Sequence, residues 1–275
     1  MLTRRQALKS LMVPFLLPSR SSQANSFNLG LHNQRGNQLL NTVLQDPHFW
    51  SSSGSVSYTG EHYDEIRLSS GEDGYLAFIS GEGKQSFGAK DVAETIFQHQ
   101  DLIPRFMPSL ISAKYIGDGV ASYNNRPYTD IYFLVDLKIL YMSVPLRTYL
   151  IEKDKGEYIC AIELITENMT EPNVWKRYQS IIAEEKEKLG DLWFFQSIVP
   201  VDFVYGFYHI TPGTKHESRV TLVTQVKFSS SDSLLASIAA ELPFVLRQGM
   251  QSGFNGSVAA CRVYRELQLN DQLRR

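Results

Sequence analysis

Residues 130–140 read Asp-Ile-Tyr-Phe-Leu-Val-Asp-Leu-Lys-Ile-Leu, and apolar residues recur in them at every second position. One face of the predicted strand carries five apolar side chains, those of Ile131, Phe133, Val135, Leu137 and Ile139. Asp136 and Lys138 fall on the opposite face. A period of two with one apolar and one polar face is typical of a strand in an antiparallel sheet that covers a core on one side.

A hairpin is predicted directly after this strand. Residues 143–153 and 157–167 have strand character and flank Asp-Lys-Gly at 154–156, which is rich in turn-forming residues. In the second strand one face carries Tyr158, Cys160, Ile162 and Leu164, and Glu163 lies on the other. Arg147 alternates with the set Val144, Leu146, Thr148 and Leu150, so we expect it on the outer face. The antiparallel sheet therefore continues past residue 140.

Further elements extend from this sheet in both directions. Upstream, we predict a strand over 75–79, helices over 89–99 and 101–108, a strand over 110–116 and a turn over 117–119. Downstream, we predict strands over 192–199, 203–210 and 217–228. An amphipathic helix over 172–189 interrupts them, and it is interpreted either as a lid or as a surface insertion.

A long helix is predicted at the C-terminal end. Ser231 and Asp232 are suited to cap a helix that runs from 233 to about 267. Gly249, Gly253, Gly256 and Ala260 recur on one side of it. An interior glycine costs up to about 1 kcal/mol relative to alanine, so the glycines need a reason. Two interpretations remain open: close approach of the helix to the sheet, or volume left free for a ligand.

The first residues have the layout of an export signal. Arg4 and Arg5 precede a short apolar stretch, and Ser22-Gln23-Ala24 offers a cleavage site. Residues 1–24 are therefore predicted to be a signal peptide similar to the twin-arginine type, with a periplasmic or secreted mature protein. The alternative is a disordered cytosolic leader. Residues 25–73, with a short helix over 37–44, are interpreted as an N-terminal extension.

Composition excludes several classes of protein. The chain has 275 residues, 43% of them hydrophobic, and a formal net charge of −2 without a cluster of basic residues, which argues against nucleic-acid binding. Two cysteines, Cys160 and Cys261, cannot form a four-ligand zinc site. They are interpreted either as one disulfide or as two buried thiols. We predict no metal and no cofactor.

The order of elements resembles the START-like helix-grip superfamily, in particular its polyketide-cyclase and coenzyme-Q-binding branches. The stretches that carry the resemblance are 89–97, Ala-Lys-Asp-Val-Ala-Glu-Thr-Ile-Phe, and 101–110, Asp-Leu-Ile-Pro-Arg-Phe-Met-Pro-Ser-Leu, followed by the strands and the long helix. The resemblance implies an α+β helix-grip fold over residues 74–268, with a curved antiparallel sheet wrapped around a long C-terminal α-helix. It also implies a cavity between sheet and helix for lipids, sterols, isoprenoids or polyketides.

Candidate ligand-binding residues come from the apolar faces of these elements. They are Phe106, Met107, Phe133, Val135, Cys160, Ile162, Leu164, Phe207, His209, Leu222, Leu246, Met250 and Phe254. His209 shares a strand face with Phe203, Tyr205 and Phe207. If that face points inward, His209 is either a general base or a hydrogen-bonding anchor for the ligand; otherwise it is a structural or rim histidine.

Three functions follow, and the sequence favours the first. The first is an exported binding or transport protein for a hydrophobic small molecule, with peripheral membrane contact as one option. The second is a protein-interaction module without a ligand, docked through residues 25–73. The third is a START-like cyclase or isomerase that uses a pocket His or Tyr. The sequence argues against an enzyme because the HExxH, GxSxG and GxGxxG motifs are missing, so no catalytic residue is assigned.

Overall fold

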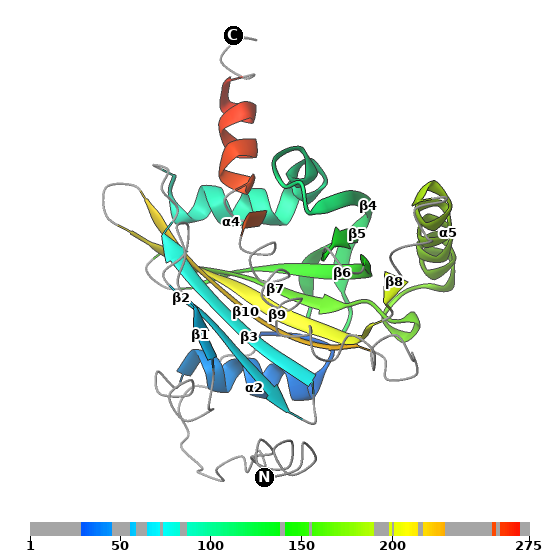
Figure 1. Cartoon of the computed structure of the whole chain (residues 1–275), viewed down its shortest axis with the longest axis horizontal. Helices are drawn as coiled ribbons and strands as arrows, with labels where there is room; N and C mark the ends of the chain where they lie inside the picture. Colours follow the sequence, from blue (N-terminus) through cyan, green and yellow to red (C-terminus); the bar gives the residue numbers. More distant parts are fainter. Residues whose placement is uncertain are drawn as a thin grey trace, which may run out of the picture.

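A computed structural model of the whole chain is shown in Figure 1. The structure describes residues 29–45, 56–58, 65–71, 74–82, 87–137, 141–153, 156–189, 198–199, 201–213, 217–228, 255–256 and 259–269.

One antiparallel sheet organises the described chain, and its strand order is β1-β2-β3-β10-β9-β7-β6-β5-β4. The short β8 pairs with β6 in parallel beside this path. The strands are β1 (Val56–Tyr58), β2 (Glu65–Gly71), β3 (Gly74–Glu82), β4 (Leu110–Ala121), β5 (Arg126–Asp136), β6 (Tyr141–Glu152), β7 (Tyr158–Leu164), β8 (Ile198–Val199), β9 (Val201–Pro212) and β10 (Ser218–Phe228). The hairpin predicted between β6 and β7 is confirmed, with Leu150 opposite Cys160.

Helices cover both faces of the sheet. On one face lie α4 (Ala89–Gln98), the 3-10 helix η1 (Gln100–Phe106) and the C-terminal helix over 259–269 (Figure 1). On the other lie α2 (Gln34–Gln45) and α5 (Pro172–Leu189). We call these the inner and the outer face. The predicted fold class is confirmed: an α+β protein with a curved antiparallel sheet and a C-terminal helix packed on it.

The helix α4 forms where its apolar residues recur at helical spacing. Ala89, Val92, Ala93 and Ile96 are all buried against the inner face, and Asp91 lies in the first turn, where a negative charge favours the helix dipole. The helix therefore docks with its whole apolar stripe on the sheet.

The predicted helix over 172–189 is confirmed as α5, but it does not cover the inner face. Its buried Tyr178 packs with Ile116, Tyr132 and Leu134 on the outer side of β4 and β5. The surface-insertion interpretation therefore holds, and the lid interpretation is wrong. The alternation in β5 predicted that its outer face would be exposed to solvent. In the structure α5 covers that face instead.

The turn predicted at 117–119 is wrong. β4 continues through these glycines to Ala121, and the register of its pairing with β5 shifts between Tyr115 and Gly117. Glycine is tolerated at such a bulge, which bends the strand without ending it. The chain turns only afterwards, at residues 122–125, where Asn125 adopts a positive φ of 53°.

The described part of residues 25–73 belongs to the same packed body. β1 and β2 pair within the sheet, next to β3. Leu29 and Leu31 are 0% and 2% exposed and pack on the outer face beside Phe207 and Val223. The division of the chain at residue 74 stays a prediction, but two strands N-terminal to it complete the sheet.

Side chains of the sheet hold residues 29–33, a segment that we call the N-terminal strap. Asn124 and Arg126 donate hydrogen bonds to the carbonyls of Gly30 and Leu29, that of Arg126 at 2.9 Å. The carboxylate of Glu163 accepts the backbone N–H of His32 at 2.8 Å and that of Asn33 at 3.3 Å. Glu163, Asn124 and Arg126 therefore supply hydrogen-bond partners for the backbone of the strap as it approaches α2.

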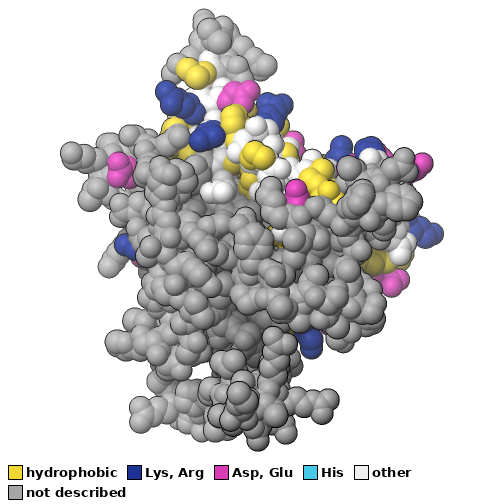
Figure 2. Space-filling view, viewed as in Figure 1, with side chains coloured by type: hydrophobic (Ala, Val, Ile, Leu, Met, Phe, Trp, Pro, Cys, Tyr) yellow, Lys and Arg dark blue, Asp and Glu magenta, His cyan; other side chains and the backbone are white. Residues whose placement is uncertain are grey.

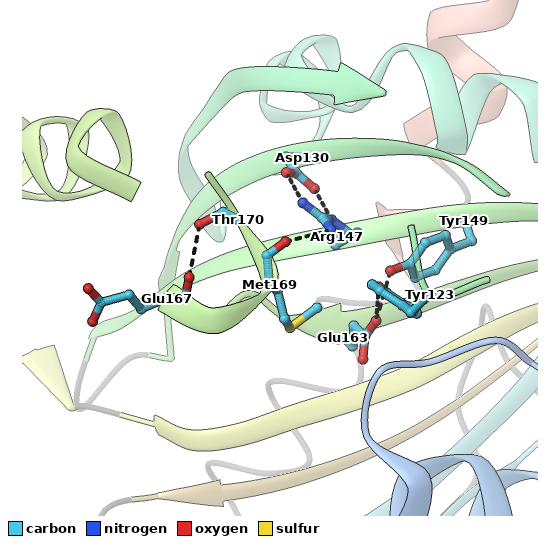
Figure 3. Close-up of polar contacts among 8 residues, drawn as sticks. All are labelled: Tyr123, Asp130, Arg147, Tyr149, Glu163, Glu167, Met169 and Thr170. Atoms are coloured by element: carbon cyan, nitrogen blue, oxygen red, sulfur yellow. Dashed lines mark hydrogen bonds and ion pairs between the residues drawn. The ribbon is translucent and has the colours of Figure 1, made fainter. Parts of the chain in front are cut away.

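Glu163 is itself buried, with 2% of its surface exposed. Two phenols, Tyr123 and Tyr149, each donate to its Oε1 at 2.9 Å (Figure 3). Burial raises the pKa of Glu163 above its ordinary value of 4.5, and the hydrogen bonds oppose that shift. The carboxylate thus connects the strap, β7 and the β4–β5 turn.

A second buried charge lies next to it. The guanidinium of Arg147 makes two parallel bonds of 2.8 Å to the Asp130 carboxylate, and a third of 3.2 Å to the Met169 carbonyl (Figure 3). Arg147 also stacks over the Tyr128 ring at 3.7 Å. Both charged side chains are nearly fully buried, at 2% and 1%. Arg147 does lie on the outer face, as expected, although protein rather than water surrounds it.

Removing the cation from this pair should destabilise the fold strongly. Arg147→Met is expected to lower the free energy of unfolding by about 3–5 kcal/mol, because Asp130 would remain buried without a partner. The double change Arg147→Met with Asp130→Leu should recover most of the loss. Urea unfolding measures both. Lys90→Met, which removes an ion pair between the exposed side chains of Lys90 and Glu94, is the control and should change little; an unchanged Arg147→Met variant would contradict the account.

The strap should contribute measurably to stability. Leu31→Ala is expected to cost about 2–5 kcal/mol, since it leaves a cavity against the outer face. The matched control is Leu269→Ala, because Leu269 is 52% exposed in the C-terminal helix. Thermal and urea unfolding of the two variants decide the question: equal stabilities would show that the strap is a dispensable appendage.

Candidate functional site

The centre of the inner face is packed less tightly than the outer face of the same strands. Inner side chains keep accessible surface, namely those of Phe133, Leu146, Ile162, Leu164 and Tyr208. Their outer-face neighbours do not: Tyr132, Tyr149, Ile159, Ala161 and Phe207 are all 0% exposed. The described helices of the inner side, α4, η1 and the helix over 259–269, therefore do not fully cover the apolar surface of the sheet.

These half-buried side chains lie side by side. Leu146 of β6 is opposite Leu164 of β7, and Ile162 of β7 is opposite Gly206 of β9. Glycine is required at 206, because a Cβ there would meet the Val223 carbonyl oxygen at 2.4 Å. The glycine thus contributes no side chain to the inner face beside Ile162.

The other end of the inner face is closed by helices. Cys160, fully buried, donates from its thiol to the Ala93 carbonyl of α4 at 3.5 Å. Gln100 of η1 donates to the Thr148 hydroxyl of β6 at 3.0 Å, and both side chains are buried. α4 and η1 are therefore attached directly to the sheet.

The C-terminal helix approaches the sheet at Gly256. A Cβ on Gly256 would lie 3.6 Å from both the Met107 sulfur and the Tyr208 hydroxyl, which is ordinary contact distance. At this position the glycine is not enforced by a clash. Gly249 and Gly253 lie outside the described residues, so the choice between close approach and ligand volume stays open for them.

Hydrophobic side chains also gather at the surface between the C-terminal helix and the region of β4 (Figure 2). Ile111 of β4 is one of the exposed large hydrophobic residues, with 43% of its surface exposed. Among the described residues, no helix is long and apolar enough to span a membrane, and no group of His, Cys, Asp and Glu side chains is arranged to hold a metal ion.

Comparisons with known proteins identify the fold. No protein-family profile and no curated sequence matches the chain. Human STARD10 matches with a TM-score of 0.54 and 11% identity over 89% of this chain and 86% of that one. Human StAR-related lipid transfer protein 5 matches with a TM-score of 0.51 and 9% identity over 84% and 95%. The chain has the START-like helix-grip fold. The Zhui aromatase/cyclase from Streptomyces sp. R1128 is more distant, with a TM-score of 0.44, 11% identity, and coverage of 68% and 96%.

Eight predicted ligand-binding residues lie on the gripped, inner side of this helix-grip fold. Phe133, Val135, Cys160, Ile162, Leu164 and Leu222 project from the sheet, and Phe106 and Met107 come from η1 and the residue after it. Within this set Cys160 is covered by α4, whereas Phe133, Ile162 and Leu164 keep accessible surface. Leu246, Met250 and Phe254 lie outside the described residues. Whether any of them binds a ligand stays a prediction.

The inward placement predicted for Phe207 and His209 is wrong. In the helix-grip fold seen here, β9 turns Val204, Tyr208 and Ile210 toward the gripped side. Phe207 packs on the outer face with Tyr149 and Ala161. β9 is a central strand with protein on both faces. Because neither face is polar, its sequence does not show which alternate residues point to the inner face.

His209 consequently has a structural environment at the outer face. Its Nε2 lies 3.2 Å from Glu157 Oε2, and Lys153 lies 3.7 Å from the same oxygen. Burial lowers the pKa of His209 below its ordinary 6.5, and the Glu157 carboxylate opposes this shift. The cyclase hypothesis thereby loses the residue on which it chiefly relied.

The two cysteines are thiols and are not bonded to each other. Burial raises the pKa of both, that of Cys261 to about 11. Neither is a thiolate at neutral pH, so neither is an activated nucleophile. Of the two interpretations, buried thiols is the correct one.

Sequence reasoning missed Leu146, Gln100 and Tyr208 as parts of the inner face. Leu146 was recognised as apolar but not selected. Gln100 sits between two predicted helices, where only tertiary packing brings it to Thr148. Tyr208 was assigned to the wrong face with the rest of its strand.

The shifted pKa of His209 predicts a pH effect on stability. As pH falls through 6.5, the unfolded chain takes up a proton that the folded state resists, so stability is lost on the acid side. His209→Gln should remove this component. Melting temperatures of the wild type and the variant, compared above and below pH 6.5, measure it; parallel curves would contradict the lowered pKa.

Proposed function

We propose that the protein binds a hydrophobic small molecule between the inner face of the sheet and the helices that cover it. The observation that carries the proposal is the contrast between the two faces. Phe133, Leu146, Ile162 and Leu164 keep accessible surface on a helix-covered side, while their outer neighbours keep none. Apolar surface left uncovered inside a fold is the usual lining of a ligand site.

Tyr208 supports an enclosed space at this place. Burial raises the pKa of its hydroxyl, so the group is removed from bulk water. Its side chain nevertheless keeps accessible surface. Its hydroxyl lies 3.6 Å from the position of a Cβ on Gly256, so it faces the C-terminal helix across the inner face.

The fold comparison supports the same class of function. One of the similar structures is named a lipid transfer protein, and its sequence is 9% identical to this one. A shared fold does not by itself transfer an activity. The similarity of fold supports the proposal for one reason: the inner face, which the C-terminal helix covers in this fold, is also the face whose apolar side chains keep accessible surface.

Binding would be driven by removal of apolar surface from water, at about 25 cal/mol per Å². The half-buried cluster on β5, β6 and β7 would supply contact area, and Tyr208 would supply a polar group. The apolar surface between the C-terminal helix and β4 (Figure 2) would serve as the entrance. Within the described part of the inner face no two side chains are placed as an acid–base pair, which favours binding over catalysis.

We extend the proposal to the location of the protein: it acts after export, with residues 1–24 removed. The supporting observation is the sequence of that segment, with Arg4, Arg5 and the Ser22-Gln23-Ala24 site. The buried strap begins at Leu29, so cleavage after Ala24 would leave every described residue in place.

Native mass spectrometry with lipid extraction tests both parts in one measurement. Protein isolated from the exported fraction should carry a hydrophobic small molecule, and the mass of its chain should correspond to a start near Asn25. Leu146→Trp should reduce the bound fraction severalfold, because the larger ring occupies the uncovered surface. Val120→Trp, at a position that is 63% exposed, is the control and should bind normally.

The outcomes separate the alternatives. A clean ligand-free mass in the folded wild type would refute ligand binding and favour an interaction module. Equal ligand loading in the Leu146→Trp and Val120→Trp variants would place the ligand elsewhere. A full-length chain with an intact leader would refute export while leaving ligand binding untouched.

A further inference from the structure

We infer that the ligand is uncharged, with a hydroxyl or carbonyl as its polar group, and that Tyr208 is the hydrogen-bonding side chain that meets it. This inference rests on the proposed function and adds the chemical class of the ligand. It comes from the distribution of charge between the two faces of the sheet.

Between the strand ends, the described charged side chains of the central strands lie on the outer face. Asp130 of β5, Arg147 of β6 and Glu163 of β7 occupy directly opposed positions, since Arg147 pairs in register with both of the others. Each is 2% exposed or less and is matched by partners on that face. The row continues on β9 and β10 with a hydrogen bond from Tyr205 to Gln225.

The inner face of the same strands carries no charge between the strand ends, within the residues described. Its side chains include Thr129, Ile131, Phe133, Val135, Met142, Val144, Leu146, Thr148, Leu150, Tyr158, Cys160, Ile162, Leu164, Val204, Tyr208, Ile210, Val220, Leu222, Thr224 and Val226. Glu152 is exposed at the end of β6. An ionised group against the centre of this face would meet no charged side chain from these described strands.

This absence selects against ionised ligands. A carboxylate or phosphate moved from water onto an apolar, enclosed surface loses hydration worth several kcal/mol unless a counter-charge replaces it. A hydroxyl or a carbonyl loses far less, and one hydrogen bond compensates for most of the loss. The same chain length in an alcohol and in an acid should therefore bind with different strength.

Tyr208 is placed to provide that hydrogen bond. Its hydroxyl projects from the inner face and lies under Gly256 of the C-terminal helix and beside Met107. The raised pKa keeps the phenol neutral at physiological pH, so it can donate to a carbonyl or accept from a hydroxyl. Tyr205, also on β9, points to the outer face, and its hydroxyl donates a hydrogen bond to the Gln225 side chain there.

A competition experiment tests the inference. The folded protein, freed of co-purifying lipid, binds the uncharged fluorophore N-phenyl-1-naphthylamine, and 1-dodecanol or sodium dodecanoate displaces it at about pH 8, where the carboxyl is ionised. We expect dodecanol to displace the fluorophore at a concentration at least about tenfold lower than dodecanoate. Equal or stronger displacement by dodecanoate would overturn the inference while leaving the proposed function standing.

Two tyrosine variants localise the hydrogen bond. Tyr208→Phe should weaken dodecanol binding about threefold to tenfold, which is the usual worth of one hydrogen bond, and leave the fluorophore affinity unchanged. Tyr205→Phe removes a hydroxyl from the same strand on the opposite face and should change neither affinity. Unchanged dodecanol affinity in the Tyr208→Phe variant would overturn the role of Tyr208. Failure of folded wild-type protein to bind the fluorophore, the alcohol and the acid would refute the proposed function itself.

Discussion

The outer face of the sheet buries three charged side chains, and each needs partners that only distant parts of the chain supply. Asp130 and Arg147 neutralise each other, and the third donor of Arg147 reaches the Met169 carbonyl beyond β7. Glu163 is held by backbone N–H groups of the strap, among them that of His32. A buried charge without partners costs several kcal/mol. The sheet therefore depends on the N-terminal strap and on the segment that precedes α5.

This constraint also shapes the inner face. Because strands alternate, the residues that flank an outward-facing charge point to the inner face, and in β6 and β7 these residues are uncharged. Arg147 stands between Leu146 and Thr148, and Glu163 between Ile162 and Leu164. The polar network is thus concentrated where α2 and α5 cover it, and the opposite face is left apolar. The proposed ligand site follows from this separation.

The elements with strong local signals were predictable. The apolar spacing of α4 and α5 at helical period and the turn residues between β6 and β7 led to correct assignments, because these features act within a few residues of chain. The sequence predicted a turn where β4 has a bulge, because Gly117 and Gly119 are compatible with either structure. The phase of β9 was misassigned, because Phe207 and Tyr208 are both aromatic and both face protein.

The sequence by itself determined the order of most elements from β3 onward, the antiparallel sheet and the resemblance to the helix-grip fold, since these depend on periodicity and local turn chemistry. It also determined that most of the candidate lining is apolar. Only the tertiary structure decided which face of β9 is gripped, that α5 lies outside, that the cysteines remain thiols and that residues 29–33 are part of the core. Each of these depends on contacts between segments far apart in the chain, and a period-two pattern does not report what covers either face of a strand.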